Sequence, residues 1–178
     1  AVVALLPAIG LLCGEPSPVR ALRSPLLLPA MASAFLSYAV FVLLGYLKDV
    51  EADRATGYHT LPVRFSRRAT VVVSLVHALA AVAVSLLLLA RGGIAPPFFT
   101  HLALWGAGVA GLLASHALAW NVRRDADASP AVTASVLSFV ALHLGEAALL
   151  RPAYGLLAPP VLVFLAFALL SRPCREQV

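Results

Sequence analysis

The sequence has few charged residues: only 12% of its 178 residues are Asp, Glu, Lys or Arg, against roughly 25% in a soluble globular domain. Hydrophobic residues make up 61% of the chain, and the mean hydropathy is +0.94. These values exclude an ordinary soluble enzyme and a disordered chain. The apolar residues fall in long blocks, not in the alternating segments of about ten residues that outer-membrane barrels show. The composition therefore predicts an all-α fold, a polytopic bundle of transmembrane helices.

Cysteine is also scarce. The chain has two cysteines, Cys13 and Cys174, which excludes a disulfide-rich scaffold and leaves no cysteine spacing for a metal site. The topology predicted below puts them on opposite membrane faces, so we expect two unpaired thiols. The net charge of +5 is compatible with nucleic-acid binding, but basic residues in a membrane protein mainly set its orientation. We therefore expect a lipid bilayer, and no nucleic acid, as a partner.

Long apolar stretches define the predicted spans. A span needs about 20 apolar residues, and five stretches reach or approach that length: 24–46, 69–90, 99–121, 130–150 and the shorter 157–171. The chain opens at Ala1 inside a further apolar run, 1–13, with no basic residues ahead of it as a secretory signal would have. We therefore expect about five to six spans, with 1–13 as the end of a truncated helix and the chain as a fragment of a longer protein.

Basic residues predict the orientation of these spans. With alternating spans, the loops 47–68, 122–129 and 172–178 share one side of the membrane. These loops hold nine of the thirteen Lys and Arg residues: Lys48, Arg54, Arg64, Arg67, Arg68, Arg123, Arg124, Arg172 and Arg175. The positive-inside rule therefore predicts a multi-pass membrane protein whose 47–68 loop is cytoplasmic.

One segment, 46–68 (YLKDVEADRATGYHTLPVRFSRR), concentrates charge at the end of a span. Asp49 and Asp53 are four residues apart, so on a helix they share a face. Paired carboxylates repel each other, and Mg²⁺, which takes one or two carboxylates together with substrate phosphates, relieves that repulsion. Lys48 and Arg54 flank the pair and can hold phosphate oxygens. The alternative is a solvated loop whose charges simply cap a span, an interpretation that suits Glu51.

The run KDVEADRATGYHTLPVRF resembles the second aspartate-rich motif of the UbiA superfamily of intramembrane prenyltransferases. The sequence departs from that motif at Ala52 and Ser66, where the family commonly has glycine. The specific likeness is confined to this run, although the helix pattern extends the resemblance over nearly the whole chain. The matching residues are Lys48, Asp49, Glu51, Asp53, Arg54, Gly57, Thr60, Leu61, Pro62, Val63 and Phe65.

The resemblance implies a helical bundle around a central cavity, with two aspartate-rich motifs facing each other at its cytoplasmic end. It makes Asp49 and Asp53 Mg²⁺ ligands, and Lys48 and Arg54 contacts of the diphosphate of a polyprenyl donor. The prenyl group passes to an aromatic or lipid acceptor. The family's first motif, NxxxDxxxD, does not occur in the chain. We therefore expect 1–178 to be the C-terminal portion of a UbiA-like domain, inactive by itself.

Two alternatives stay open. A UbiA-type terpene cyclase uses the same prenyl diphosphate but needs no acceptor. A non-catalytic helix bundle, degenerate or transporter-like, would carry the motif without the activity.

Other polar residues are predicted to be structural. Asn121 and Asp125 form the nearest match to the missing motif, but they lack its third ligand and are predicted to form a turn. His143 and Glu146 lie three residues apart inside a span, where they can pair with each other, and we favour a structural pair over an acceptor-binding role. The other histidines inside the spans are predicted to be packed or interfacial: His77, His101 and His116.

Overall fold

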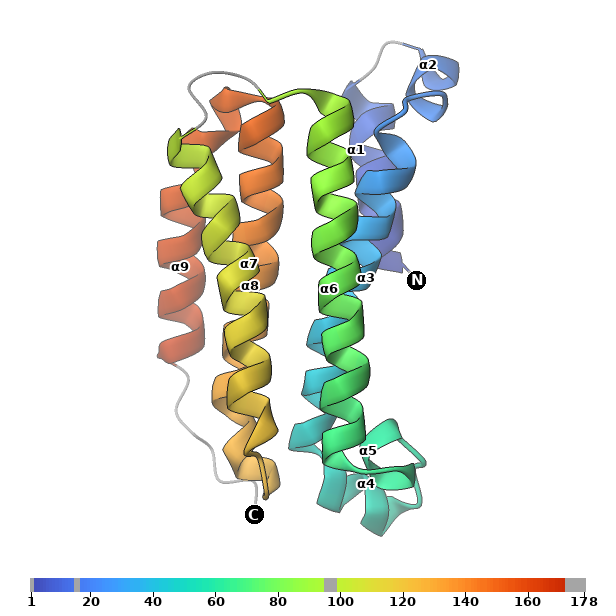
Figure 1. Ribbon diagram of the computed structural model, residues 1–178, viewed down its shortest axis with the longest axis vertical. Helices are drawn as coiled ribbons and strands as arrows, with labels where there is room; N and C mark the ends of the chain where they lie inside the picture. The colour runs from blue at the N-terminus through green and yellow to red at the C-terminus, as the bar shows by residue number, and fades with distance from the viewer. Residues whose placement is uncertain (1, 15–16, 95–98, 172–178) are drawn as a thin grey trace.

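The computed structural model describes residues 2–14, 17–94 and 99–171, and all regular structure in these ranges is helical. Figure 1 shows a helical bundle, and four of the helices in the described ranges are much longer than the rest. They are long and apolar enough to cross a membrane, and they confirm the predicted all-α membrane fold. Their bounds are α3 (Leu27–Gly45), α6 (Arg67–Gly92), α7 (Phe99–Trp120) and α8 (Ser129–Leu150).

Short helices connect and flank these four. The predicted span 157–171 corresponds to the shorter apolar helix α9, which begins only after the 3₁₀ helix η4. At 1.5 Å per residue its 13 residues extend about 20 Å, against about 30 Å for the bilayer core. The predicted run 1–13 corresponds to η1 and α1, which cover residues 2–14 and are also short. The bounds are η1 (Val2–Leu5), α1 (Leu6–Gly14), α2 (Pro18–Leu22), η2 (Tyr46–Lys48), α4 (Val50–Thr56), α5 (Leu61–Arg64), η3 (Asp125–Ala128), η4 (Pro152–Leu157) and α9 (Ala158–Leu170).

The long helices alternate in direction, so α4, α5 and η3 gather at one end of the bundle (Figure 1). That end carries more basic residues of the described chain than the other end, where Arg20, Arg23, Arg91 and Arg151 lie. Residues 172–178, with Arg172, Cys174 and Arg175, lie outside the described residues. The prediction of unpaired thiols therefore stays a prediction. The basic residues at the α4 end are Lys48, Arg54, Arg64, Arg67, Arg68, Arg123 and Arg124.

Helices α7 and α8 run side by side and pack closely through glycine (Figure 1). A Cβ added to Gly108 would lie 2.4 Å from the backbone nitrogen of Leu142. A Cβ added to Gly145 would lie 2.6 Å from the backbone nitrogen of Trp105. Small residues allow such close approach of membrane helices, which is one of the main sources of their association.

Polar side chains link neighbouring helices inside the bundle. Nδ1 of His116 lies 2.6 Å from the backbone oxygen of Leu112, and its Nε2 lies 2.9 Å from Ser74 Oγ on α6. Trp105 Nε1 donates to Ser85 Oγ at 2.8 Å, which joins α7 to α6 a second time. His116 is buried, so its predicted packing role is confirmed.

A second polar cluster joins α8 to α3. His143 Nδ1 donates to Glu146 Oε2 at 2.7 Å, which confirms the predicted pair. Ser33 Oγ donates to Glu146 Oε1 at 2.7 Å, and His143 Nε2 lies 2.9 Å from Ser37 Oγ. Ser33 is sixteen residues before Asp49, or roughly 24 Å along a helix. The cluster therefore lies far from the aspartates and holds helices together.

Candidate active site

The aspartate pair lies just after the C-terminal end of α3. The 3₁₀ helix η2 continues α3 as far as Lys48, and Asp49 then occupies the N-cap position of α4. The backbone N–H of Asp53 donates to the backbone oxygen of Asp49 at 2.7 Å. Leu47 and Val50, on either side of Asp49, are fully buried. The two aspartates therefore lie one helical turn apart on a segment that its apolar neighbours fix in place.

The side chain of Asp49 does not cap α4, although the residue occupies the N-cap position. N-cap aspartates normally accept a hydrogen bond from the N–H of the second or third helical residue. Here the N–H of the second residue, Glu51, donates instead to Asp125 Oδ2 at 2.8 Å. The cap thus comes from the connection between α7 and α8, and the exposed carboxylate of Asp49 is not used for capping.

Gly57 ends α4 in the left-handed conformation, with φ of 77°. The N–H of Tyr58 donates to the backbone oxygen of Asp53 at 2.8 Å, and the N–H of Gly57 donates to the backbone oxygen of Arg54 at 3.4 Å. These bonds form a Schellman motif, in which glycine avoids the strain that a side chain would bring. The motif's glycine is therefore required by the turn.

The residues after this turn return the chain to the aspartates. Thr60 precedes α5, and Pro62 lies in the first turn of that helix, a position that proline tolerates. Thr60 Oγ1 donates to Asp53 Oδ2 at 2.8 Å, which orients that carboxylate. In the sequence, Thr60 is only one of the residues that match the motif. Its seven-residue separation from Asp53, across a turn at Gly57, was the available signal for this contact.

Lys48 and Arg54 are exposed, and neither forms an ion pair with Asp49 or Asp53 in the described structure. Arg54 lines a cavity of about 380 Å³ together with Arg67 and Arg68, and neither aspartate is part of its lining. Lys48 and Arg54, the predicted phosphate contacts, are therefore adjacent to the aspartates in the sequence. Arg54 also lies in a cluster with Arg67 and Arg68.

The donor set suits Mg²⁺ better than a metal held by protein alone. Among the residues that the structure describes, no three His, Cys, Asp or Glu side chains lie together as a metal site. The available groups are the carboxylate of Asp49, which is not used for capping, and that of Asp53, one oxygen of which accepts from Thr60. Mg²⁺ is commonly bound by one or two carboxylates plus water and substrate phosphates. The two aspartates fit that pattern.

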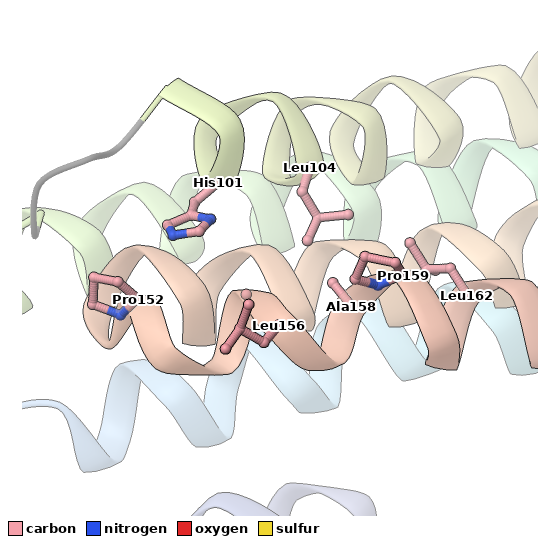
Figure 2. A pocket seen from close by; sticks show the side chains of 8 residues that line it. His101, Leu104, Pro152, Leu156, Ala158, Pro159 and Leu162 are labelled. Atoms are coloured by element: carbon pink, nitrogen blue, oxygen red, sulfur yellow. The ribbon is translucent and has the colours of Figure 1, made fainter.

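A second cavity, of about 390 Å³, lies at the opposite end of the bundle. Figure 2 shows His101 and Leu104 of α7 facing Pro152 and Leu156 of η4, with Leu162 of α9 beside them. Its lining is mostly apolar and includes no acidic residue. This cavity is therefore separate from the aspartate site.

The model of the UbiA prenyltransferase family matches residues 1–142. The chain belongs to this family. Comparisons with curated proteins and with solved structures gave no significant match. The UbiA match includes α3, residues 46–66 that carry the aspartates (the aspartate segment), α6 and α7. The match ends inside α8, so α9 lies beyond it. The predicted family is confirmed, and the four candidate spans agree with a UbiA protein integral to the membrane.

Proposed function

We propose that the chain is the C-terminal portion of a Mg²⁺-dependent membrane prenyltransferase. In this proposal, the enzyme transfers an isoprenoid chain from a polyprenyl diphosphate to an aromatic or lipid acceptor. The supporting observation is the arrangement of Asp49 and Asp53, one turn apart at the end of a candidate membrane span. UbiA proteins are typically prenyltransferases, and this arrangement lies within the family match.

Five residues of the aspartate segment have a defined role in the proposal. Asp49 and Asp53 bind the metal through carboxylate oxygens, and Thr60 orients Asp53. Lys48 and Arg54 donate hydrogen bonds to diphosphate oxygens. Bound Mg²⁺ supplies the positive charge that stabilises the diphosphate as a leaving group.

The transfer itself exchanges one bond for another. The bond between the first prenyl carbon and the diphosphate oxygen breaks, and its electron pair leaves with the diphosphate. An aromatic carbon or hydroxyl oxygen of the acceptor bonds to that prenyl carbon and loses a proton.

The proposal requires carboxylates beyond those of residues 1–178. Asp49 and Asp53 are the two carboxylates that the proposal assigns to the metal, and a second cluster of the NxxxDxxxD type is expected from an N-terminal part of the domain. The basic residues at the α4 end favour a cytoplasmic position for the 47–68 loop. A polyprenyl diphosphate would then reach the site with its headgroup in the cytoplasm and its chain in the bilayer.

The test uses the full-length gene product in membranes, with labelled geranylgeranyl diphosphate and a panel of labelled acceptors. Diphosphate release is measured with Mg²⁺ and with EDTA for the wild type, Asp49→Asn, Asp53→Asn and the control Asp127→Asn. We expect each of the first two substitutions to lower Mg²⁺-dependent release by about 100-fold or more, because each removes a metal ligand worth several kcal/mol of charge stabilisation. Asp127→Asn should leave it unchanged. Release that neither Asp49→Asn nor Asp53→Asn affects would refute the assignment.

The alternatives predict different products in this assay. A terpene cyclase releases diphosphate and forms the same cyclised product whether or not an acceptor is added. A non-catalytic helix bundle shows no Mg²⁺-dependent release at all.

A further inference from the structure

Asp125 connects two segments that are far apart in the sequence. It begins η3, in the connection between α7 and α8, yet both of its carboxylate oxygens are bound by the aspartate segment and α6. Oδ2 accepts the backbone N–H of Glu51 at 2.8 Å, and Oδ1 accepts a hydrogen bond from Arg67 Nη2. The same Arg67 nitrogen lies 3.7 Å from Glu51 Oε1. One side chain therefore joins α4, α6 and η3.

The contact between Asp125 and Arg67 is partly shielded from water. The side chain of Asp125 is 18% exposed and that of Arg67 is 21% exposed. Beside them, Leu47 of the aspartate segment and Val122 and Ala128 of the α7–α8 connection belong to one buried apolar cluster. Apolar packing thus fixes the two backbones relative to each other, and the short aspartate side chain needs to span only the remaining gap.

We propose that Asp125 is a positioning residue for the metal site, because it caps α4 in place of Asp49. Asp49 has φ of −121° and ψ of 14°, outside the extended region that N-cap residues normally adopt. The first N–H groups of a helix have no acceptor within the helix, and the side chain of Asp49 accepts none of those of α4. Asp125 supplies that acceptor, so the carboxylate of Asp49 stays available to Mg²⁺. This inference rests on the proposed function, in which Asp49 is a metal ligand.

Arg67 lowers the electrostatic repulsion between Asp125 and the carboxylates of the aspartate segment. Asp125 brings a further negative charge to a segment that already holds Asp49, Glu51 and Asp53. The guanidinium of Arg67 contacts Asp125 and lies 3.7 Å from Glu51, so its single positive charge partly offsets the negative charges of both. Asp49 and Asp53 then remain as the two carboxylates whose negative charge a bound metal ion would balance.

Asp127 provides a matched control in the same 3₁₀ helix. Its carboxylate accepts the backbone N–H of Arg124 at 3.0 Å and lies 3.4 Å from Arg124 Nη2. The pKa of Asp127 is lowered mainly by this backbone hydrogen bond, so the side chain is charged at neutral pH. Substitution of Asp127 removes the same charge from the same loop without touching α4.

The experiment measures metal binding directly on the purified full-length protein. Mn²⁺ is titrated in the presence of inorganic diphosphate, and free Mn²⁺ is followed by electron paramagnetic resonance. We expect Asp125→Ala to weaken Mn²⁺ binding about tenfold or more, as loss of outer-shell partners of metal ligands does. Asp127→Ala should change it less than twofold. Asp125→Asn keeps an oxygen that can accept the Glu51 N–H and should recover most of the affinity.

Each other outcome overturns the inference. Unchanged Mn²⁺ binding in Asp125→Ala would show that Asp49 does not depend on the cap. Equal losses in Asp125→Ala and Asp125→Asn would assign the effect to the charge contact with Arg67 and not to the cap. Asp125→Ser, whose side chain is too short to reach the Glu51 N–H, replaces the alanine variant if that variant fails to fold.

Asp49→Asn separates this inference from the proposed function. If Asp49→Asn abolishes Mn²⁺ binding and Asp125→Ala does not weaken it, only the positioning role fails. If Asp49→Asn binds Mn²⁺ like the wild type, the proposed metal site itself is wrong.

Discussion

The hydrogen-bonded pair of buried Glu146 and half-buried His143 gives the sharpest prediction about stability. Glu146 is 5% exposed and accepts hydrogen bonds from Ser33 and His143, so it joins α8 to α3. Glu146→Ala removes both acceptors and leaves the imidazole of His143 without its carboxylate. Glu146→Gln keeps the shape and one oxygen acceptor. The two substitutions therefore differ mainly in how many buried donors lose their partner.

The expected magnitudes follow from these contacts. Hydrogen bonds between membrane helices contribute about 0.6 kcal/mol on average and up to about 1.7 kcal/mol, so two such bonds account for about 1–3 kcal/mol. A buried donor that loses its partner costs about 1–3 kcal/mol, and Glu146→Ala leaves the donors of Ser33 and His143 without theirs. We expect Glu146→Ala to lower the free energy of unfolding by about 2–5 kcal/mol, and Glu146→Gln by about 1–2 kcal/mol.

Reversible unfolding of the full-length protein in mixed micelles with increasing SDS, followed by tryptophan fluorescence, measures these differences. The matched control is Glu51→Gln, because the side chain of Glu51 is 66% exposed and its contact with Arg67 is 3.7 Å long. An exposed ion pair contributes at most about 1 kcal/mol, so the control should unfold close to the wild type. Unfolding of Glu146→Ala within about 0.5 kcal/mol of the wild type, below the typical loss of one such bond, would refute the structural role of the pair.

Two further predictions concern glycine. Gly145→Ala should destabilise the protein by about 1–3 kcal/mol in the same SDS assay, because its Cβ would lie 2.6 Å from the Trp105 backbone, whereas Gly106→Ala, with no atom within 4 Å, should not. Gly57→Ala should cost about 1–2 kcal/mol locally, because φ of 77° is strained for a residue with a Cβ. The measurable result is a higher Mn²⁺ concentration at half-saturation, and unchanged binding would mean that the turn does not position Asp53.

The long helices could be predicted from the sequence because one continuous apolar run marks a membrane span without any knowledge of tertiary contacts. The stretch 24–46 corresponds to α3 (Leu27–Gly45), and 130–150 corresponds to α8 (Ser129–Leu150). The stretch 157–171, which is shorter than the other stretches, corresponds to the shorter helix α9 (Ala158–Leu170).

The same distinction applies within the site. The spacing of Asp49 and Asp53 is a property of one helix, and the structure places them on successive turns as a helix requires. The contact between Thr60 and Asp53 depends on the left-handed turn at Gly57, which the sequence marks only by its glycine. A local pattern therefore identifies the carboxylates but not the groups that orient them.

Asp125 shows why the remaining part of the site could not be read from spacing. Asp125 lies in a turn, as predicted, since it begins the short helix η3, but a turn does not determine where its side chain points. That direction depends on how α7 and α8 pack against α3 and α6, which brings Asp125 to Glu51 across 74 residues. Both residues lie inside the UbiA match, and α9 lies outside it. The matched region therefore contains both the metal-binding candidates and the residue that we propose holds them in position.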